Sequence, residues 1–417
     1  MNDREFAVQV VEKLQAAGYQ ALWAGGCVRD SLVEKIPKDY DVATEATPEQ
    51  VRDLFGHKRT LPIGAAFGVI TVLGPKPVNP IEVATFRRDS DYSDGRRPDS
   101  VEYTNAEEDA RRRDFTINGM FYDPVAEKVI DYVGGQEDLQ LKQIRAIGSA
   151  HERIDEDKLR MLRGVRFAAT FDFELESETL AAIQQHAEEI RVVSPERIGT
   201  EIRRMFSHEN FLIAVRLLIQ SNLWQEVLPE SVRALDQFDQ SYWAQRMVEL
   251  ERLNSNSFAA VLTILFREIA QVIDSGSKKP LLSIALQDAW RLKNDERDRL
   301  AWLYRHVDGL RAADELAWSA VQPQLIAPNA ALAVDVVEAL DGPTSATRFC
   351  RERLAWPVEQ LNPTPLIDGA TLIENGIQPG PSFTKIIAAA RAMQLDDEIS
   401  TREEALKVAR EFDAGDR

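Results

Sequence analysis

Strand-like patterns are confined to the first third of this chain, and helical periodicity continues from about residue 138 almost to its end. Short apolar runs between turn residues predict strands at 21–24, 39–43, 67–73 and 81–86. Helix starts are predicted at Thr47-Pro48-Glu49-Gln50, Ser194-Pro195-Glu196 and Ser400-Thr401-Arg402-Glu403. We therefore expect an α+β fold, in which a small mixed β-sheet with helices is followed by an all-α remainder.

The charge of the chain limits the kinds of partner it can have. The 417 residues include 50 Lys+Arg and 68 Asp+Glu, which gives a formal net charge of −18. Such acidity argues against a protein that coats nucleic acid by broad electrostatic attraction, but it leaves room for a local basic groove. Arginines gather in one part of the sequence, at Arg87, Arg88, Arg96, Arg97, Arg111, Arg112, Arg113, Arg160, Arg163 and Arg166. We expect phosphates to bind there.

Two cysteines, Cys27 and Cys350, exclude a disulfide framework and a cysteine-based zinc site. No apolar run approaches the roughly 18 residues needed to cross a bilayer. The charged N-terminal stretch is unlike a signal peptide. We expect a cytoplasmic protein without a membrane partner, and nothing in the sequence implies an obligatory protein partner.

Two aspartates, Asp39 and Asp41, lie two residues apart on the predicted strand 39–43, so their carboxylates project from one face. Mg²⁺ prefers one or two carboxylates together with substrate phosphates. Two such ions activate an attacking hydroxyl and stabilise a leaving pyrophosphate. Glu82 on the strand 81–86 is either a third carboxylate of this site or an outward-facing strand residue. Asp-x-Asp alone also fits a solvated strand end.

A pair of glycines, Gly25 and Gly26, follows the strand 21–24 and opens a helix upstream of Asp39. Glycines at such a turn let backbone N–H groups approach a triphosphate, although a tight strand-to-helix turn has the same signature. Arg29 follows in the same helix, and its guanidinium would point back towards these phosphates.

Together these residues resemble the DNA polymerase β nucleotidyltransferase superfamily, in which Gly-Gly and a spacer precede Asp-x-Asp. Within it, the chain is similar to the class II tRNA nucleotidyltransferases, or CCA-adding enzymes, and to the bacterial poly(A) polymerases. Four segments carry the resemblance in the family's order: 25–30 with 38–41, 112–118, 156–163 and 194–198.

The resemblance implies template-independent addition or repair of the 3′-terminal CCA of tRNA from CTP and ATP, with release of pyrophosphate. It implies two Mg²⁺ ions held by Asp39 and Asp41, and Glu82 stays a candidate for a further catalytic carboxylate on the strength of its place on the strand. It assigns nucleotide contact to Gly25, Gly26, Arg29, Arg113, Asp114, Asn118, Asp157, Arg160, Arg163 and Arg166.

Four parts of the chain follow from the same resemblance. They are a nucleotidyltransferase head at 1–137, a helical neck that recognises the base at 138–206, a helical body at 207–330 and a helical tail at 331–417. The body and tail of the family hold the acceptor stem and upper half of tRNA. In the tail, Lys385, Arg391 and Arg402 are candidates for phosphate contact, and a solvated helix face is the competing interpretation.

Asp157 and Arg160 also have a physical interpretation of their own. At i and i+3 of a predicted helix they share a face, and one is an acceptor while the other is a donor. Cytosine and adenine both offer an amino donor beside a ring-nitrogen acceptor, whereas uracil and guanine present the reverse. The pair therefore selects CTP and ATP without a nucleic-acid template. The competing interpretation is an ordinary ion pair within a helix.

Several alternatives remain open at this stage. The polar segment from Arg87 to Pro98 is expected to be a loop, and the family resemblance implies a flexible loop needed for A addition, with Tyr92, Asp94, Arg96 and Arg97. An enzyme that adds only A and a bacterial poly(A) polymerase share the same signatures. A non-catalytic RNA-binding protein on this fold is the alternative from another class, and it would not need Asp39 and Asp41.

Overall fold

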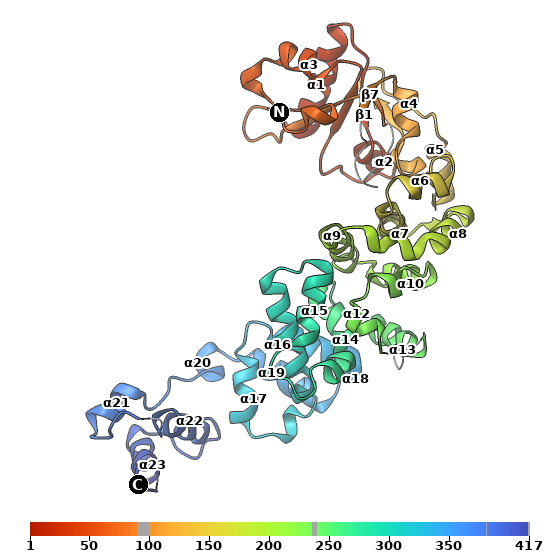
Figure 1. Cartoon of the computed structure of the whole chain (residues 1–417). Coiled ribbons are helices and arrows are strands. Elements are labelled where there is room, and N and C mark those ends of the chain that lie inside the picture. Colours follow the sequence, from red (N-terminus) through yellow and green to blue (C-terminus); the bar gives the residue numbers. More distant parts are fainter. Residues whose placement is uncertain (90–100, 236–239, 381, 416–417) are drawn as a thin grey trace. The chain divides into compact units, whose positions relative to one another are not determined.

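The computed structural model describes residues 1–89, 101–235, 240–380 and 382–415. The chain divides into two compact units, Met1–Leu228 and Pro229–Arg417. Figure 1 colours their helices and strands in chain order. The four-part division into head, neck, body and tail stays a prediction.

The first unit begins with a mixed region of strands and helices. Its strands are β1 Ala21–Ala24, β2 Asp41–Thr44, β3 Thr60–Leu61, β4 Val69–Val72, β5 Ile81–Thr85, β6 Arg87–Asp89, β7 Val101–Tyr103, β8 Phe121–Asp123 and β9 Lys128–Ile130. Its helices are α1 Asp3–Ala16, α2 Gly26–Leu32, α3 Pro48–Phe55, α4 Ala106–Arg111 and α5 Gly135–Leu141.

Seven of these strands form one sheet in the order β3-β4-β5-β2-β1-β8-β9, while β6 and β7 pair separately. β2 and β5 run parallel, and the other neighbours in the sheet are antiparallel. The parallel register places Asp41 opposite Glu82. Phe6, Val10 and Leu14 on one face of α1 join the buried cluster that includes Trp23 and Val42. This small mixed sheet confirms the fold class expected from the sequence.

Two strand predictions need correction. The strand expected at 39–43 begins only at Asp41, so Asp39 lies in the segment that leads into β2. The strand expected at 67–73 is shortened to β4, because a 3₁₀ turn at Ala65–Phe67 precedes it. That turn lies between Gly64 and Gly68, whose φ angles of 96° and 80° favour glycine.

The first unit continues as helices with one very short ladder. The helices are α6 Ala150–Glu156, α7 Leu159–Phe171, α8 Ser177–His186, α9 Pro195–Phe206, α10 Phe211–Gln220 and α11 Leu223–Val227. The two-residue strands β10 Gln143–Ile144 and β11 Glu174–Leu175 pair in parallel. This ladder departs from the all-α expectation for the region after residue 138. It ties the start of the region to the end of α7.

The second unit is helical throughout its described residues. Its helices are α12 Glu230–Arg233, α13 Gln240–Glu251, α14 Phe258–Ile273, α15 Leu281–Trp290, α16 Asn294–Leu310, α17 Trp318–Leu325, α18 Ala330–Asp341, α19 Ser345–Leu354, α20 Val358–Leu361, α21 Gly369–Glu374, α22 Ser382–Leu395 and α23 Arg402–Gly415. α14 is buried along most of its length. Residues of α21, α22 and α23 form a separate apolar cluster that includes Leu372, Ile386 and Ala405.

The start of α23 is displaced by one residue from its expected position. The sequence predicts a capping box from Ser400 to Glu403, but Glu404 accepts from the backbone N–H of Ser400 and of Thr401 at 2.8 Å and 3.0 Å. The Glu404 N–H donates to the Thr401 hydroxyl at 3.3 Å. Among the residues described, no helix is both long enough and apolar enough to pass through a membrane.

Candidate active site

A polar pocket of about 890 Å³ lies within the first unit. It brings together residues from β1–α2, the start of β2, the segment after α4, the α6–α7 junction and α7 itself. Asp39, Asp41 and all ten residues to which the sequence assigned nucleotide contact line it. Glu82 does not line the pocket but faces Asp41 across the β2–β5 ladder. The sequence therefore located residues that the fold does place together.

The two glycines shape the wall of the pocket at the end of β1. Gly25 caps α2 with φ 70°, a backbone conformation that favours glycine. A Cβ at this position would lie 3.0 Å from Nη1 of Arg113. Glycine at position 25 therefore serves two purposes here, the turn and the close approach of a guanidinium to the backbone.

Arg29 is held in place from two sides, although it lies only one helical turn after the glycines. Its Nη1 donates to Oδ1 of Asn118 at 2.5 Å, and its Nε and Nη2 donate to Asp30 at 2.9 Å and 2.7 Å. Its guanidinium also lies 4.5 Å from the ring centroid of Phe171. These contacts fix the direction of a positive charge that faces the pocket.

The carboxylates of the pocket repel one another. Burial of the Asp41 carboxyl group, together with the nearby carboxylates of Asp39 and Glu82, raises the pKa of Asp41 to about 6, and Arg113 opposes this shift. An accumulation of negative charge that the chain itself does not neutralise fits a hard divalent cation. The structure thus groups Asp39, Asp41 and Glu82 electrostatically, even though Asp39 is not on the strand.

Asp109 anchors two arginines at the same pocket. Its buried carboxylate accepts from Nε and Nη2 of Arg112 at 2.9 Å and 2.7 Å, and from Nε and Nη2 of Arg113 at 3.2 Å and 2.9 Å. Burial alone would raise the pKa of Asp109, but Arg113 and Arg112 hold it below its ordinary value. The sequence analysis missed Asp109. Its position on α4, at i−3 and i−4 from the two arginines, is the signal that could have identified it.

Asp114 connects the loop after α4 to α7. Its carboxylate accepts from Nε and Nη2 of Arg163 at 2.8 Å and 2.5 Å, from Nδ2 of Asn118 at 3.0 Å and from the backbone N–H of Phe115 at 2.8 Å. Although burial raises it, the Arg163 charge and these hydrogen bonds lower the pKa of Asp114 to about 2. Asp114 therefore holds Arg163 of α7, Asn118 and the loop after α4 together at the pocket.

Replacing Asp114 by Asn should destabilise the protein at neutral pH by about 2 kcal/mol, since each unit of pKa shift corresponds to about 1.4 kcal/mol. The folded-state pKa lies below the unfolded value, so this contribution is present above about pH 4 and is lost as the pH falls towards 2. Urea unfolding at pH 7 and pH 3 measures the effect. Glu107→Gln, which removes the exposed ion pair with Arg111, is the control and should change little. An equal loss of stability in both variants would show that the buried Asp114 carboxylate does not make this contribution.

Asp157 and Arg160 line the same pocket, but they do not share a helix as the sequence predicted. Asp157 has an extended backbone, with φ −151°, and separates α6 from α7. Arg160 lies in the first turn of α7. The break frees Asp157 from the helical ladder, and its carboxylate caps the backbone N–H of Leu159 at 3.0 Å. The alternative of an Asp157–Arg160 ion pair is not realised, because each has other partners.

Each member of this pair is oriented by a different part of the unit. Arg197 on α9 donates to Oδ1 and Oδ2 of Asp157 at 3.1 Å and 2.6 Å. Arg160 donates to the carbonyls of Arg153 and Arg112 at 2.8 Å and 3.2 Å, and also to the Glu156 carboxylate. The acceptor and the donor are therefore pre-positioned before any base arrives.

Comparison with known proteins places this geometry in a family. A family model described as the Poly A polymerase head domain matches residues 21–145, and one for a probable RNA and SrmB-binding site of polymerase A matches residues 172–235. A CCA-adding enzyme of Levilactobacillus brevis is 31% identical over 413 residues, which cover 97% of this chain and 97% of that protein. The chain belongs to the family of CCA-adding enzymes.

Two solved structures of CCA-adding enzymes share the fold. The Bacillus stearothermophilus CCA-adding enzyme in complex with CTP matches with a TM-score of 0.72 at 25% identity, over 98% of this chain and 97% of that one. The Thermotoga maritima CCA-adding enzyme complexed with tRNA_CCA matches with a TM-score of 0.70 over 99% of this chain and 95% of that one. At 19% identity, this second match shows the fold alone.

In this member of the CCA-adding enzyme family, the residues of the expected flexible loop, Tyr92, Asp94, Arg96 and Arg97, lie outside the described residues. The start of the loop expected from Arg87 to Pro98 is wrong, because Arg87–Asp89 form the strand β6. β6 and β7 pair in antiparallel register, and Arg88 forms a 2.6 Å ion pair with Glu102.

The tail candidates differ in how far the chain already uses them. Arg391 donates to the carbonyl of Pro363 at 2.7 Å and to Oδ1 of Asn362 at 2.8 Å. Arg402 lies 3.3 Å from both the Thr371 hydroxyl and the Glu374 carboxylate. Lys385 is exposed on α22. Contact of these three residues with tRNA stays a prediction.

Aromatic side chains of α7 also line the pocket, and the sequence analysis did not single them out. The Arg166 guanidinium lies 4.0 Å from the ring centroid of Phe167, and Arg166 donates to the buried carboxylate of Glu201 at 2.5 Å. Phe167 is one residue after Arg166, and Phe171 is one helical turn further on the face that lines the pocket. Helical spacing from Arg163 could have identified Phe171, whereas nothing local marks Glu201.

Another group of side chains in the first unit also lies close enough together to hold a metal ion. Asp155, His186 and Glu189 offer ligand atoms within 4.8 Å of one another. However, the Lys158 ammonium lies 2.6 Å from Asp155 and 2.5 Å from Glu189. A cation of the chain already neutralises this group, so it does not resemble the unneutralised carboxylates around Asp41.

Proposed function

We propose that this chain adds or repairs the 3′-terminal CCA of tRNA, using CTP and ATP and releasing pyrophosphate. The observation that supports this function is that Asp157 and Arg160 line the same pocket as Asp39 and Asp41. Groups that can choose a base thus lie in one cavity with carboxylates that can serve nucleotidyl transfer. A protein of this fold that only bound RNA would not need the carboxylates of Asp39 and Asp41.

The free hydrogen-bonding positions of the pair suit cytosine and adenine. Arg160 carries five N–H donors, and its partners in the described part of the chain use three of them. Oδ2 of Asp157 accepts one described hydrogen bond, from Arg197, and keeps a lone pair. One acceptor beside free donors matches an amino group next to a ring-nitrogen acceptor. Uracil and guanine would place acceptor against acceptor and donor against donor, which leaves polar groups of the base and of the site unpaired at a cost in free energy.

Asp39 and Asp41, with Glu82 beside them, are the residues that would hold Mg²⁺. The carboxylates of Asp39 and Glu82 add to burial in raising the pKa of Asp41, and a bound divalent cation would relieve this repulsion. When bound, Mg²⁺ ions would polarise the α-phosphate, activate the 3′-hydroxyl and neutralise the leaving pyrophosphate. Arg29 and Arg113, which line the same pocket and are both fixed by hydrogen bonds, would orient the triphosphate.

Three tRNA substrates distinguish this function from its close alternatives. They end before the first C, after the first C, and after CC, and each is offered CTP or ATP. We expect C addition to the first two and A addition to the third, followed by termination. An enzyme that adds only A would extend only the third substrate, and a poly(A) polymerase would continue to add A after the first one. Either result would contradict the proposal.

Deleting residues 90–97 should abolish A addition and leave C addition largely intact. The family resemblance implies that this loop is needed when the site changes from CTP to ATP. Incorporation of AMP on a tRNA ending in CC, compared with CMP on a tRNA ending in C, measures the effect. Replacing the same residues by an equally long Gly/Ser segment separates the side chains from the length. Retained A addition in the deletion would refute the role.

We also propose the four-part division of the chain and a cytoplasmic location. The boundary between head and neck is supported by the secondary structure of the described residues, in which the seven-stranded sheet ends before residue 138 and Asp157 and Arg160 follow it. The cytoplasm is where tRNA and both nucleotides are available together.

A further inference from the structure

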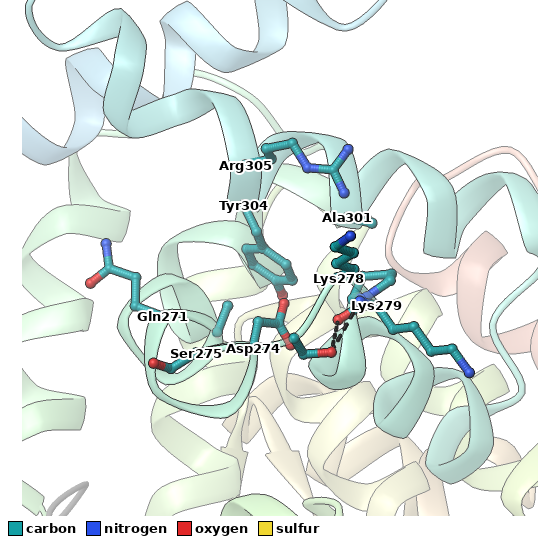
Figure 2. Close-up of a pocket in the computed structure, with 11 residues that line it drawn as sticks. Gln271, Asp274, Ser275, Lys278, Lys279, Ala301, Tyr304 and Arg305 are labelled. Atoms are coloured by element: carbon teal, nitrogen blue, oxygen red, sulfur yellow. Dashed lines mark hydrogen bonds between the residues drawn. The ribbon is translucent and has the colours of Figure 1, made fainter.

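A second pocket, of about 310 Å³, is built entirely from the second unit. It lies where α14 ends, where the following loop leads into α15, and where α16 passes this loop (Figure 2). Its charged lining residues are Asp274, Lys278, Lys279 and Arg305. No assignment made from the sequence includes any of them.

The three cations of this pocket are available to a ligand. Lys278, Lys279 and Arg305 are exposed, and none forms an ion pair within the described part of the chain. Other arginines of the same unit are satisfied internally, as in the 2.8 Å pair of Arg267 with Asp308 and the 2.6 Å pair of Arg311 with Asp341. In a chain with a net charge of −18, this is a local concentration of unused positive charge.

The lining contains one carboxylate, that of Asp274, against three cations, so a positive excess remains. Oδ1 of Asp274 accepts from the backbone N–H of Leu282 at 2.9 Å, which holds the carboxylate at the start of α15 without neutralising it. The turn that carries the lysines is fixed by its own hydrogen bonds. The Ser277 hydroxyl donates to the carbonyl of Lys279 at 3.1 Å and accepts from its N–H at 3.0 Å.

The remaining lining suits a phosphate better than a nucleobase. Its one aromatic residue is Tyr304, which is buried, and whose hydroxyl donates to the carbonyl of Leu262 at 3.4 Å. Tyr304 is only 9% exposed, so the lining offers little aromatic surface on which a base could stack. Cations without a stacking surface recognise the backbone and carry no sequence information.

We propose that this pocket binds a backbone phosphate of the RNA substrate through Lys278, Lys279 and Arg305. The inference rests on the proposed function, which supplies an RNA as the substrate. It also gives the second unit a phosphate contact of a different kind from the tail arginines, because Arg391 and Arg402 already donate within the chain.

A pair of double variants of the full chain tests the pocket. Lys279→Gln with Arg305→Gln removes two pocket cations. Arg299→Gln with Lys407→Gln removes two exposed cations outside the lining and leaves the same net charge. Affinity for a tRNA lacking its 3′-terminal A is measured by fluorescence anisotropy at several salt concentrations.

We expect the pocket variant to bind this tRNA about fivefold or more weakly at 0.1 M salt, with the slope of log K against log salt reduced by about one. The control variant should keep the wild-type affinity and slope. Equal behaviour of the two double variants would overturn the proposal. So would loss of pyrophosphate binding in the pocket variant with unchanged RNA affinity, because the pocket would then hold a free anion.

Incorporation of CMP and AMP by the unchanged chain, measured in parallel, keeps the two proposals separate. If the chain incorporates neither nucleotide but binds RNA in a pocket-dependent way, the proposed function fails and the phosphate site is supported. If incorporation is normal but the double variants bind alike, the phosphate site fails alone.

Discussion

Asp41→Asn should reduce nucleotide incorporation by about 10³-fold or more while making the metal-free protein more stable at pH 8. The loss follows because a bound metal contributes several kcal/mol to the transition state, and each 1.4 kcal/mol is about tenfold in rate. The gain in stability follows because burial and the carboxylates of Asp39 and Glu82 raise the pKa of Asp41 to about 6. Its charged form is therefore disfavoured in the folded chain.

The sign of the stability effect depends on pH. Between the unfolded-state pKa of about 4 and the folded-state pKa of about 6, the folded chain binds more protons than the unfolded chain, so its stability falls as the pH rises. The advantage of Asp41→Asn should thus be full above pH 6 and disappear near pH 4. Thermal unfolding in EDTA across this range measures it.

Asp114→Asn is the matched control, because it removes a carboxylate from the same pocket and should lower stability at neutral pH. If Asp41→Asn is destabilising at pH 8 in EDTA, the carboxylates do not repel one another as described. In the unchanged chain, affinity for Mg²⁺ should also fall as the pH drops below about 6, because Asp41 becomes protonated.

Asp157→Ala should change which nucleotide the enzyme chooses. Loss of the acceptor removes a charge-assisted hydrogen bond to the amino group of cytosine or adenine, for which about 1.5–3 kcal/mol is typical, or about 10- to 100-fold in efficiency. It also removes the repulsion of the carbonyl of uracil or guanine. We therefore expect kcat/KM for CTP to fall and the ratio of UTP to CTP incorporation to rise by about 10-fold or more.

Asp157→Asn provides a second comparison, because it keeps one acceptor oxygen but weakens the bidentate contact with Arg197. Its discrimination should lie between those of the wild type and Asp157→Ala. Asp155→Asn is the control: this neighbouring acid binds Lys158 and does not line the pocket, so selection should be unchanged. If all three variants select CTP over UTP equally well, base choice does not depend on Asp157.

The sequence predicted which residues line the pocket better than it predicted the contacts that bring them together. Gly25, Asp41 and Arg163 belong to local motifs whose residue types already limit the chemistry, and all three line one cavity. The closeness of Glu82 to Asp41 could not be read locally, because it arises from the parallel register of two strands about forty residues apart. Sequence alone left its role open for that reason.

Other errors have equally specific causes. Asp157 was assigned to a helix because its spacing to Arg160 fits one, but its carboxylate caps α7 and is held by Arg197 from a separate helix. No local sequence pattern distinguishes Glu201 from the other charged residues of α9. Only tertiary packing brings it to Arg166. Local pattern thus identifies groups that face the substrate, whereas their supporting partners come from distant segments.

Every described residue that lines the polar pocket belongs to Met1–Leu228, and none comes from the described part of Pro229–Arg417. With the function proposed above, chemistry and nucleotide choice would be encoded in one compact unit, and the second unit could vary in sequence without altering either. Substitutions in the second unit should act on KM for the RNA and leave the CTP-to-UTP ratio constant. Selection could in this way retune the enzyme to different RNA substrates while the nucleotides it adds stay the same.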